Sequence, residues 1–201
     1  NVPQLMDFNE SSIFQDFCNE LTEMGYNYSY SVVFCPDYGI PQRRRRLVLL
    51  ASKLGEISIL PKTHTPDNYV TVRDVISSLP PIESGEICVT DPLHRARQLS
   101  PLNIKRIQAT KEGGSWRDWP DELVLDCFKK DSGRTYGSVY GRMKWNEPAP
   151  TMTTQCTGLG NGRFGHPEQD RAISLREAAI FQTFPENYQF AEHNNVSNPS
   201  I

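Results

Sequence analysis

The sequence lacks the features that mark membrane proteins, disulfide-rich secreted proteins and metal sites. No apolar run approaches the roughly 18 residues that a membrane-spanning helix needs. The five cysteines are odd in number and widely spaced, and they form no Cys-x-x-Cys pair, so neither a disulfide framework nor a zinc site is predicted. His64 and His94 show no partner spacing that suggests a metal. We therefore expect a cytoplasmic globular protein with reduced cysteines, no metal and no membrane partner.

A basic excess is also absent. The chain has 21 Lys and Arg against 24 Asp and Glu, a net charge of -3. This balance argues against indiscriminate binding of nucleic acid, because general phosphate binders are usually basic. Positive residues are nevertheless clustered, and a folded domain could gather several clusters on one face. Taken alone, such clusters are better explained as solvated surface. They lie at 43–46, 94–97, 105–106, 129–134 and 142–144.

The first part of the chain has the pattern of the end of a wound α/β domain. The spacing Ser12-x-x-Gln15 predicts a capped helix that Gly25 can end. Alternating residues at 28–34 predict a strand, and the continuous apolar run at 47–51 predicts a second strand, buried on both faces as in a parallel sheet. An isolated remnant of a parallel sheet would leave a bare edge and an uncovered face. We therefore expect this part to need further strands or a partner.

The rest of the chain alternates short helices with loops. Helix starts are predicted by Thr71-x-x-Asp74, by Ser100 before Pro101, and by Ser174-x-x-Glu177. The stretch 116–167 is rich in Gly, Thr, Pro and aromatic residues, which favours a small, mostly β domain with long loops. The polar stretch 192–200 predicts a frayed tail.

Two motifs far apart in the chain carry a resemblance to a known family. The first is Tyr38-Gly39-Ile40-Pro41-Gln42-Arg43-Arg44-Arg45-Arg46, followed by the apolar run; the second is Arg171-x-x-Ser174-x-Arg176-Glu177, running on to Phe184-Pro185. Together they resemble the cytosine-5 DNA methyltransferases. That family carries a Gln-x-Arg-x-Arg element before a buried strand, then a variable DNA-recognising region, then an Arg-x-x-Thr-x-Arg-Glu helix that ends in Phe-Pro.

The resemblance implies an α/β fold class. We expect a remnant of the Rossmann-like sheet of an S-adenosylmethionine-dependent methyltransferase, plus a small, mostly β target-recognition domain. Residues 1–78 would be the C-terminal part of the catalytic domain, and residues 79–170 the DNA-binding target-recognition domain. Residues 171–201 would be a hinge helix and a tail that return to the catalytic domain.

The blocks that perform the family's chemistry have no counterpart here. Absent from the sequence are the Phe-x-Gly-x-Gly cofactor loop, the Pro-Cys nucleophile loop and the Gly-Asn-x-Val element. The chain opens on Asn1-Val2-Pro3, which resembles the tail of the family's Glu-Asn-Val element, so Asn1 would follow the missing catalytic glutamate. We expect a C-terminal portion of a methyltransferase whose parent uses S-adenosylmethionine. By itself, the chain should be inactive and contribute no cofactor-binding residue.

The resemblance also implies where a reaction would occur. In the family, a cysteine thiolate attacks C6 of a cytosine swung out of the duplex, and a methyl group passes from S-adenosylmethionine to C5. Gln42, Arg44 and Arg46 would lie at this site, with an arginine holding the base at O2. Arg44 and Arg46 are two residues apart, so in an extended segment they share one face, and Arg43 and Arg45 share the other. A solvated basic loop is the alternative for a lone arginine run.

No residue of the chain replaces the missing nucleophile. Cys35 precedes Pro36, whereas the family needs Pro before Cys. Cys35 also ends a predicted strand, where a role in the core is favoured over reactivity. His166, in a glycine-rich loop, is expected to be structural.

Several residues are candidates for DNA contact. The stretches 140–154 and 161–167 resemble the later part of the family's target-recognition region and the loop that joins it to the Arg-Glu helix. Glycines there would let the backbone approach DNA closely. The alternative is a turn-rich domain in which the Gly and Pro residues only form turns and do not contact DNA. The candidates are Arg142, Lys144, Thr153, Thr154, Arg163, Arg171 and Arg176.

Two classes of function follow. The first is part of a DNA cytosine-5 methyltransferase of a restriction-modification system, acting on double-stranded DNA together with a missing N-terminal half. The second is a DNA-binding module or a subunit of a split methyltransferase that does not itself catalyse. An RNA methyltransferase of the same family is disfavoured by the long segment between the two motifs. The residues do not predict which DNA sequence is recognised.

Overall fold

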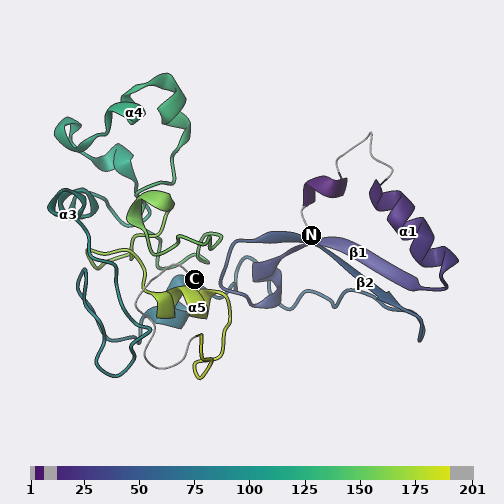
Figure 1. The fold of residues 1–201 in the computed structure, drawn as a ribbon. Helices are drawn as coiled ribbons and strands as arrows, with labels where there is room; N and C mark the ends of the chain where they lie inside the picture. Colours follow the sequence, from purple (N-terminus) through teal and green to yellow (C-terminus); the bar gives the residue numbers. More distant parts are fainter. Residues whose placement is uncertain (1–2, 7–12, 191–201) are drawn as a thin grey trace. The chain divides into compact units, whose positions relative to one another are not determined.

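The computed structural model describes residues 3–6 and 13–190, and these form two compact units (Figure 1). Unit 1 consists of Asn1–Gly39 and Arg43–Tyr69, and unit 2 consists of Ile40–Gln42 and Val70–Ile201. The predicted boundary near residue 78 therefore differs from the observed one, because the helix after Thr71 belongs to unit 2. The Arg-Glu helix belongs to the same unit as the region that precedes it. Asn1, Ser12 and the predicted tail at 192–200 lie outside the described residues.

Unit 1 is built on an antiparallel hairpin with one helix packed against it. β1 (Asn27–Phe34) pairs with β2 (Arg45–Ser52) in the register Asn27↔Ser52 to Phe34↔Arg45. The helix α1 (Ile13–Glu23) packs against β1, where the rings of Phe14 and Tyr30 lie edge to face with centroids 4.9 Å apart. A 3-10 turn, η1 (Pro3–Met6), precedes it.

The sheet of unit 1 corrects the expectation of parallel strands. Its two strands run antiparallel, because the turn at 35–44 is too short for the crossover that parallel strands require. Only Leu47 of β2 is buried, and its apolar neighbours are half-buried. The apolar run at 47–51 is a strand, as predicted, but its faces are only partly covered by the described residues.

Unit 2 is a loop-rich body with short helices. They are α2 (Val72–Ile76), α3 (Pro101–Gln108), α4 (Asp126–Lys129) and α5 (Leu175–Phe181), with the 3-10 turns η3 (Trp116–Asp118), η4 (Asp121–Leu123), η5 (Asp131–Thr135) and η6 (Leu159–Asn161). The predicted helix starts are confirmed. Thr71 and Asp74 form a reciprocal capping box before α2, and the Ser100 hydroxyl accepts a hydrogen bond from Asn103 N before α3.

The expectation of a mostly β region at 79–170 is wrong for the described chain, which has no strand in this range. Isolated bridges such as Arg142↔Gly165 and Gly165↔Ala172 take the place of ladders. The frequent Gly and Pro residues interrupt every stretch that could extend into a strand. The backbone groups of these loops are paired in local turns and isolated bridges, and arginine side chains add further hydrogen bonds to their carbonyls.

Four hydrophobic clusters of described residues position the loops of unit 2, and two of them bear most on the site. The larger one joins α2 and α5, and its fully buried members include Ile76, Ile173 and Phe181. A smaller aromatic cluster is built from Trp116, Trp119 and Phe128, the first and last of which stack with centroids 4.7 Å apart. Across residues 3–6 and 13–190, no helix has the length and apolarity to cross a membrane, and no His, Cys, Asp and Glu side chains gather in threes that could hold a metal.

Candidate functional site

The arginine run lies at the entry to β2 in unit 1. Arg44 and Arg46 are half-buried whereas Arg43 and Arg45 are exposed, so the predicted alternation is confirmed. The Arg45 guanidinium lies 4.6 Å from the centroid of the Phe34 ring, and Arg46 Nη1 donates to the carbonyl of Arg45 at 2.7 Å. The arrangement presents two guanidinium groups on one face of an extended segment.

The arginine run starts beside Cys35, at the end of β1. Cys35 N donates to the carbonyl of Arg44 at 2.8 Å. Burial raises the pKa of the Cys35 thiol, and the charges of Arg44 and Arg46 only partly oppose this shift. A thiol with a raised pKa is less ionised at neutral pH and is a weaker nucleophile.

A buried carboxylate holds the turn that precedes the arginines. Asp37 is 5% exposed, within η2 (Cys35–Tyr38), and it accepts hydrogen bonds from Lys62 Nζ at 2.7 Å and from the Tyr69 hydroxyl at 2.5 Å. These hydrogen bonds hold the pKa of the Asp37 carboxyl below its ordinary value. Asp37 was not among the residues predicted from the sequence. The signal that could have found it is an acidic residue directly before Tyr-Gly in a turn.

Gly39 completes this turn and cannot be replaced without strain. Its φ of 76° is in the left-handed region, and a Cβ there would lie 2.8 Å from Cε1 of His64. The backbone of His64 is in turn fixed to the carbonyl of Asp37 by a hydrogen bond of 3.0 Å. Only glycine meets both requirements.

Gln42 is a tether within unit 2 rather than an open side chain. It is 3% exposed, its Nε2 donates to the carbonyl of Phe181 at 3.2 Å, and its Oε1 accepts from Met152 N at 3.1 Å. Ala149 N donates to the carbonyl of Pro41 at 2.9 Å, so the residue before Gln42 is also hydrogen-bonded to unit 2. Both ends of the Gln42 amide are therefore used by backbone groups of unit 2.

The Arg-Glu motif forms a buried ion pair. Arg171 is 0% exposed and grips both oxygens of Glu177, while its Nε donates to the carbonyl of Ile82 at 3.1 Å. Ser174 caps α5: its hydroxyl accepts from Glu177 N at 3.1 Å, and its own N donates to the Glu177 carboxylate at 2.7 Å. Burial raises the pKa of the Glu177 carboxyl, but the hydrogen bonds and charge of Arg171 outweigh it, so the pKa lies below its ordinary value.

Two buried histidines adjoin this pair, and His166 is neutral. His166 Nδ1 accepts from the backbone N of Glu168 at 3.1 Å and of Gln169 at 2.9 Å, so it carries no proton. Burial lowers the pKa of His166 to about 4. His94 Nε2 lies 2.8 Å from the carbonyl of Pro80 and must donate to it, because a carbonyl only accepts. The structural role predicted for His166 fits these contacts.

The remaining arginine candidates are bound within unit 2. Arg142 is 5% exposed and donates to the carbonyls of Ile107, Thr110, His166 and Gln169 and to the carboxylate of Asp170. Arg163 Nη1 donates to the carbonyls of Gly113 and Gly114, each at 2.5 Å. Arg176 holds Asp91 through Nε at 2.5 Å and Nη2 at 3.0 Å. These side chains join loops that have no strands to connect them.

The predicted DNA-contact residues therefore divide by burial. Arg142 and Arg171 are inside unit 2, and their donors are used by protein groups, so we remove them from the candidate DNA interface. Arg163 and Arg176 are half-buried and bound to protein groups, so they too are assigned to the framework. Exposed side chains are those of Lys144, which pairs with Glu147 at 2.5 Å, and of Thr153 and Thr154 on the loop before η6.

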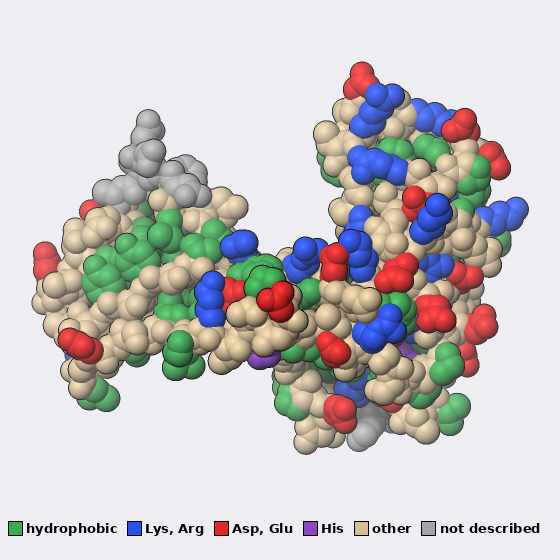
Figure 2. Space-filling model, turned by 180° about the vertical axis from the view of Figure 1, so that it is seen from behind, with side chains coloured by type: hydrophobic (Ala, Val, Ile, Leu, Met, Phe, Trp, Pro, Cys, Tyr) green, Lys and Arg blue, Asp and Glu red, His purple; other side chains and the backbone are tan. Residues whose placement is uncertain are grey.

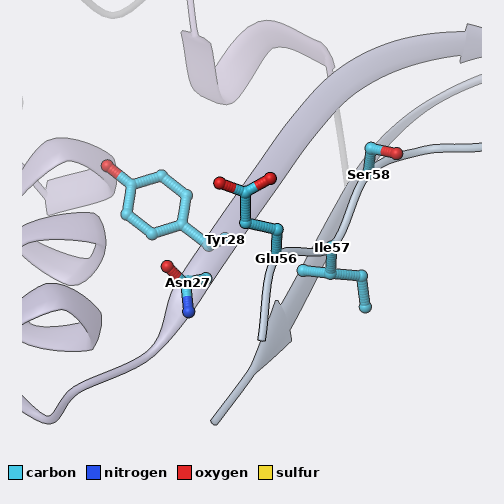
Figure 3. A pocket seen from close by; sticks show the side chains of 5 residues that line it. All are labelled: Asn27, Tyr28, Glu56, Ile57 and Ser58. Atoms are coloured by element: carbon cyan, nitrogen blue, oxygen red, sulfur yellow. The ribbon is translucent and has the colours of Figure 1, made fainter. Parts of the chain in front are cut away.

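Unit 1 also has an open cavity of about 520 Å³ (Figure 3). Asn27 and Tyr28 come from β1, and Glu56, Ile57 and Ser58 from the segment after β2. A nucleotide-type cofactor is usually held on a glycine-rich turn that follows a strand. No glycine is among the described residues that line this cavity.

These features describe a protein that combines an α/β unit, bearing half-buried arginines on a hairpin, with a loop-rich unit closed by a buried ion pair. A solved structure of a "putative DNA modification methyltransferase encoded within prophage" (E. coli) has a similar fold. It matches with a TM-score of 0.63 at 19% identity, and covers 94% of this chain and 59% of that chain. The class of fold is therefore that of a methyltransferase.

The chain belongs to the C-5 cytosine-specific DNA methylase family, which matches residues 1–199. It is 60% identical to Type II methylase M.HgiDII of Herpetosiphon aurantiacus over 95% of this chain and 54% of the relative. It is 32% identical to DNA (cytosine-5)-methyltransferase 3 of Arabidopsis thaliana, over 98% of this chain and 18% of the relative. It is 31% identical to Type II methyltransferase M1.BsuMI of Bacillus subtilis (strain 168), over 96% of this chain and 43% of the relative. The chain thus spans about half of M.HgiDII, and less of the other two.

Proposed function

We propose that this chain is the C-terminal part of a DNA cytosine-5 methyltransferase of a restriction-modification system. The whole protein would transfer a methyl group from S-adenosylmethionine to C5 of a cytosine flipped out of double-stranded DNA. The observation that carries this proposal is the 60% identity to M.HgiDII over nearly the whole chain. Family membership and the half-buried pair Arg44 and Arg46 support it.

Arg44 and Arg46 are the residues of this chain that we assign to the reacting base. A flipped cytosine presents its O2 to the protein, and a guanidinium is a fixed fork of donors that keeps its charge at neutral pH. The turn held by Asp37 sets where the arginine run starts, and β2 fixes its direction. The nucleophilic thiol and the general acid of the family must come from outside this chain.

No residue here is assigned to S-adenosylmethionine. The cofactor supplies the electrophilic methyl group when it is bound. The sequence lacks the glycine loop that the family uses, and no glycine is among the described residues that line the cavity of unit 1. We therefore propose that the whole protein binds it through a part outside this chain.

Unit 1 fits the edge of a larger Rossmann-like sheet. A two-stranded hairpin is marginal by itself in water, and hydrophobic side chains gather over unit 1 on the face shown in Figure 2. Contiguous exposed apolar surface marks an interaction site. We assign this face to contact with the remaining part of the methyltransferase. The large apolar side chains exposed among the described residues of unit 1 are Met6, Ile13, Phe17, Met24, Tyr30, Val32, Leu54 and Leu60.

Unit 2 is proposed as the target-recognition region. Lys144, Thr153 and Thr154 are exposed and chemically suited to DNA, as a phosphate partner and as hydroxyl donors and acceptors. The buried arginines of the same region hold the loops that carry these residues. A rigid loop presents a polar side chain to a base edge at a lower entropic cost than a mobile one does.

The test is a methyl-transfer assay with labelled S-adenosylmethionine and double-stranded DNA. The chain alone should show no turnover, and adding the part of M.HgiDII that lies outside the matched region should restore it. Turnover by the chain alone would overturn the assignment of the catalytic groups to another part. DNA binding without turnover in the complemented mixture would favour a DNA-binding module that does not catalyse.

A further inference from the structure

A cavity of unit 2 is lined by the two arginines of the positive cluster at 94–97. Its volume is about 370 Å³. The residues that line it are Gly85, Arg95, Ala96, Arg97, Gln98, Thr157 and Leu175. No carboxylate is among them, so the lining combines positive charge with hydroxyl and amide groups.

The two arginines stand on one face of a short hairpin. Ala96 N donates to the carbonyl of Glu86 at 3.0 Å, and a bridge joins Ile87 to Arg95. Along this extended segment, Ala96 is buried at 6% exposure, whereas Arg95 is half-buried and Arg97 is exposed. The alternation turns both guanidinium groups away from the core.

The hairpin is anchored firmly to the rest of unit 2. His94 precedes the arginines and is 1% exposed. Its Nε2 donates to the carbonyl of Pro80 at 2.8 Å, and its Nδ1 lies 2.9 Å from the hydroxyl of Ser174, the cap of α5. Because the ring is held at both nitrogens, the backbone that carries Arg95 and Arg97 has a fixed position.

The charge of Arg97 is not neutralised within the described residues, where it forms no ion pair with a carboxylate. The cavity is also connected in sequence to the proposed DNA interface, because Thr157 follows Thr153 and Thr154 on the same loop. A guanidinium is a common partner of a DNA phosphate, to which it can donate two hydrogen bonds at once.

We propose that this cavity binds one phosphate of the DNA backbone, with Arg97 as its principal contact and Arg95 beside it. The proposal rests on the assignment of unit 2 to target recognition. A phosphate contact sets the register of the duplex on the protein and carries no sequence information of its own. It would place the loop at 153–157 over a defined base pair.

The experiment measures binding of fluorescent double-stranded oligonucleotides, of target and scrambled sequence, over a series of salt concentrations. The protein is the full chain with the complementing part of M.HgiDII. Arg97→Gln removes the charge, Arg97→Lys keeps it, and Lys53→Gln is the matched control, because Lys53 is exposed in unit 1 and does not line the cavity. Thermal unfolding of each variant is measured alongside.

Arg97→Gln should weaken both sequences alike, by roughly three- to tenfold. It should also reduce the slope of log affinity against log salt by about 1. Arg97→Lys should retain the slope, and Lys53→Gln should match the wild type. If the wild type shows salt-dependent binding and Arg97→Gln keeps its slope, the phosphate site is overturned and target recognition stands. If the wild type does not bind DNA, the assignment of unit 2 fails and this site fails with it.

Discussion

Arg171 and Glu177 face each other as a two-pronged ion pair in the interior of unit 2. Arg171 Nη1 lies 2.8 Å from one carboxylate oxygen of Glu177, and Nη2 lies 2.8 Å from the other. Each side chain is 1% exposed. In such a place, each charge depends on its partner, because water cannot replace it. Arg171 and Glu177 of the Arg-Glu motif therefore hold the interior of unit 2 together.

Removing one member of this pair should strongly destabilise the fold. Arg171→Met leaves the carboxylate of Glu177 buried without its cation, and we expect the free energy of unfolding to fall by about 3 to 5 kcal/mol. Urea unfolding measures it. Lys129→Met is the control, because Lys129 and Asp126 form an exposed pair that should contribute less than about 1 kcal/mol. If the two variants lose equal stability, the buried pair does not hold the interior of unit 2 together.

Replacing both charges should be less harmful than replacing one. The double variant Arg171→Met, Glu177→Leu removes the unpaired charge along with the pair, so its loss should be well below the sum of the two single losses. A double-variant cycle from urea unfolding gives the coupling energy. Additive losses would contradict a direct interaction between the two side chains.

The neutral state of His166 should make stability depend on pH. The pKa of His166 in the fold is about 4, below the value of about 6.5 expected for the unfolded chain. The contribution of neutral His166 to the free energy of unfolding is therefore fully present above about pH 6.5. It is lost as the pH falls from there towards 4. Glu177 keeps its charge over most of this window, because its pKa is lowered. We expect unfolding free energy to decline by up to about 1.4 kcal/mol per pH unit from this group.

A single substitution isolates the contribution of His166. In His166→Asn, the side-chain oxygen can accept the backbone hydrogen bonds that Nδ1 now accepts, but the side chain does not titrate. The decline between about pH 6.5 and 5 should then be shallower than in the wild type. An equally steep decline would assign the pH dependence to other groups.

Local sequence signals predicted the local structure well. The capping boxes at Thr71 and Ser174 and the two strands at 27–34 and 45–52 depend on residues that are close in the chain. The alternation of Arg44 and Arg46 with their neighbours follows from strand geometry alone. These features needed no knowledge of the tertiary fold.

Burial of the arginines could not be predicted in the same way. Arg142 binds carbonyls more than twenty residues away on either side, and Arg171 binds Ile82. The sequence alone does not show whether the donors of an arginine bind DNA or protein carbonyls. The mostly β prediction for 79–170 failed for a related reason, since turns, isolated bridges and arginine side chains rather than neighbouring strands pair the backbone of those loops.

Gln42 should stabilise unit 2 through both ends of its amide. Gln42→Ala leaves the carbonyl of Phe181 and the N of Met152 without these partners, which should cost about 1 to 3 kcal/mol. The backbone amide of Met152 should also exchange faster with solvent, as measured by hydrogen exchange. Gln155→Ala serves as the control, because the Gln155 side chain is exposed. If the Met152 amide exchanges at the same rate in Gln42→Ala as in the wild type, Gln42 does not hold this part of unit 2 in place.

The exposed residues of unit 2 should separate into base and phosphate contacts. The double variant Thr153→Ala, Thr154→Ala should reduce the preference for the target over scrambled DNA by about 1 to 3 kcal/mol. Lys144→Ala should weaken all sequences alike and reduce the salt slope by about 1. Binding of both variants to a panel of DNA sites at several salt concentrations tests this. If the threonine variant keeps its preference, recognition lies elsewhere in unit 2.

Arg46 should matter for methyl transfer much more than for DNA affinity, because we assign it to the flipped base rather than to the duplex. In the complemented enzyme, Arg46→Ala removes a charged hydrogen bond of about 1.5 to 3 kcal/mol, which corresponds to roughly tenfold or more in rate. Arg44→Ala should behave similarly or destabilise unit 1. Arg45→Ala is the control, since Arg45 is exposed on the opposite face and lies over Phe34. Single-turnover rates and binding constants are measured for all three. If Arg46→Ala and Arg45→Ala both turn over at the wild-type rate, the run is a solvated basic loop and the base is held by residues outside this chain.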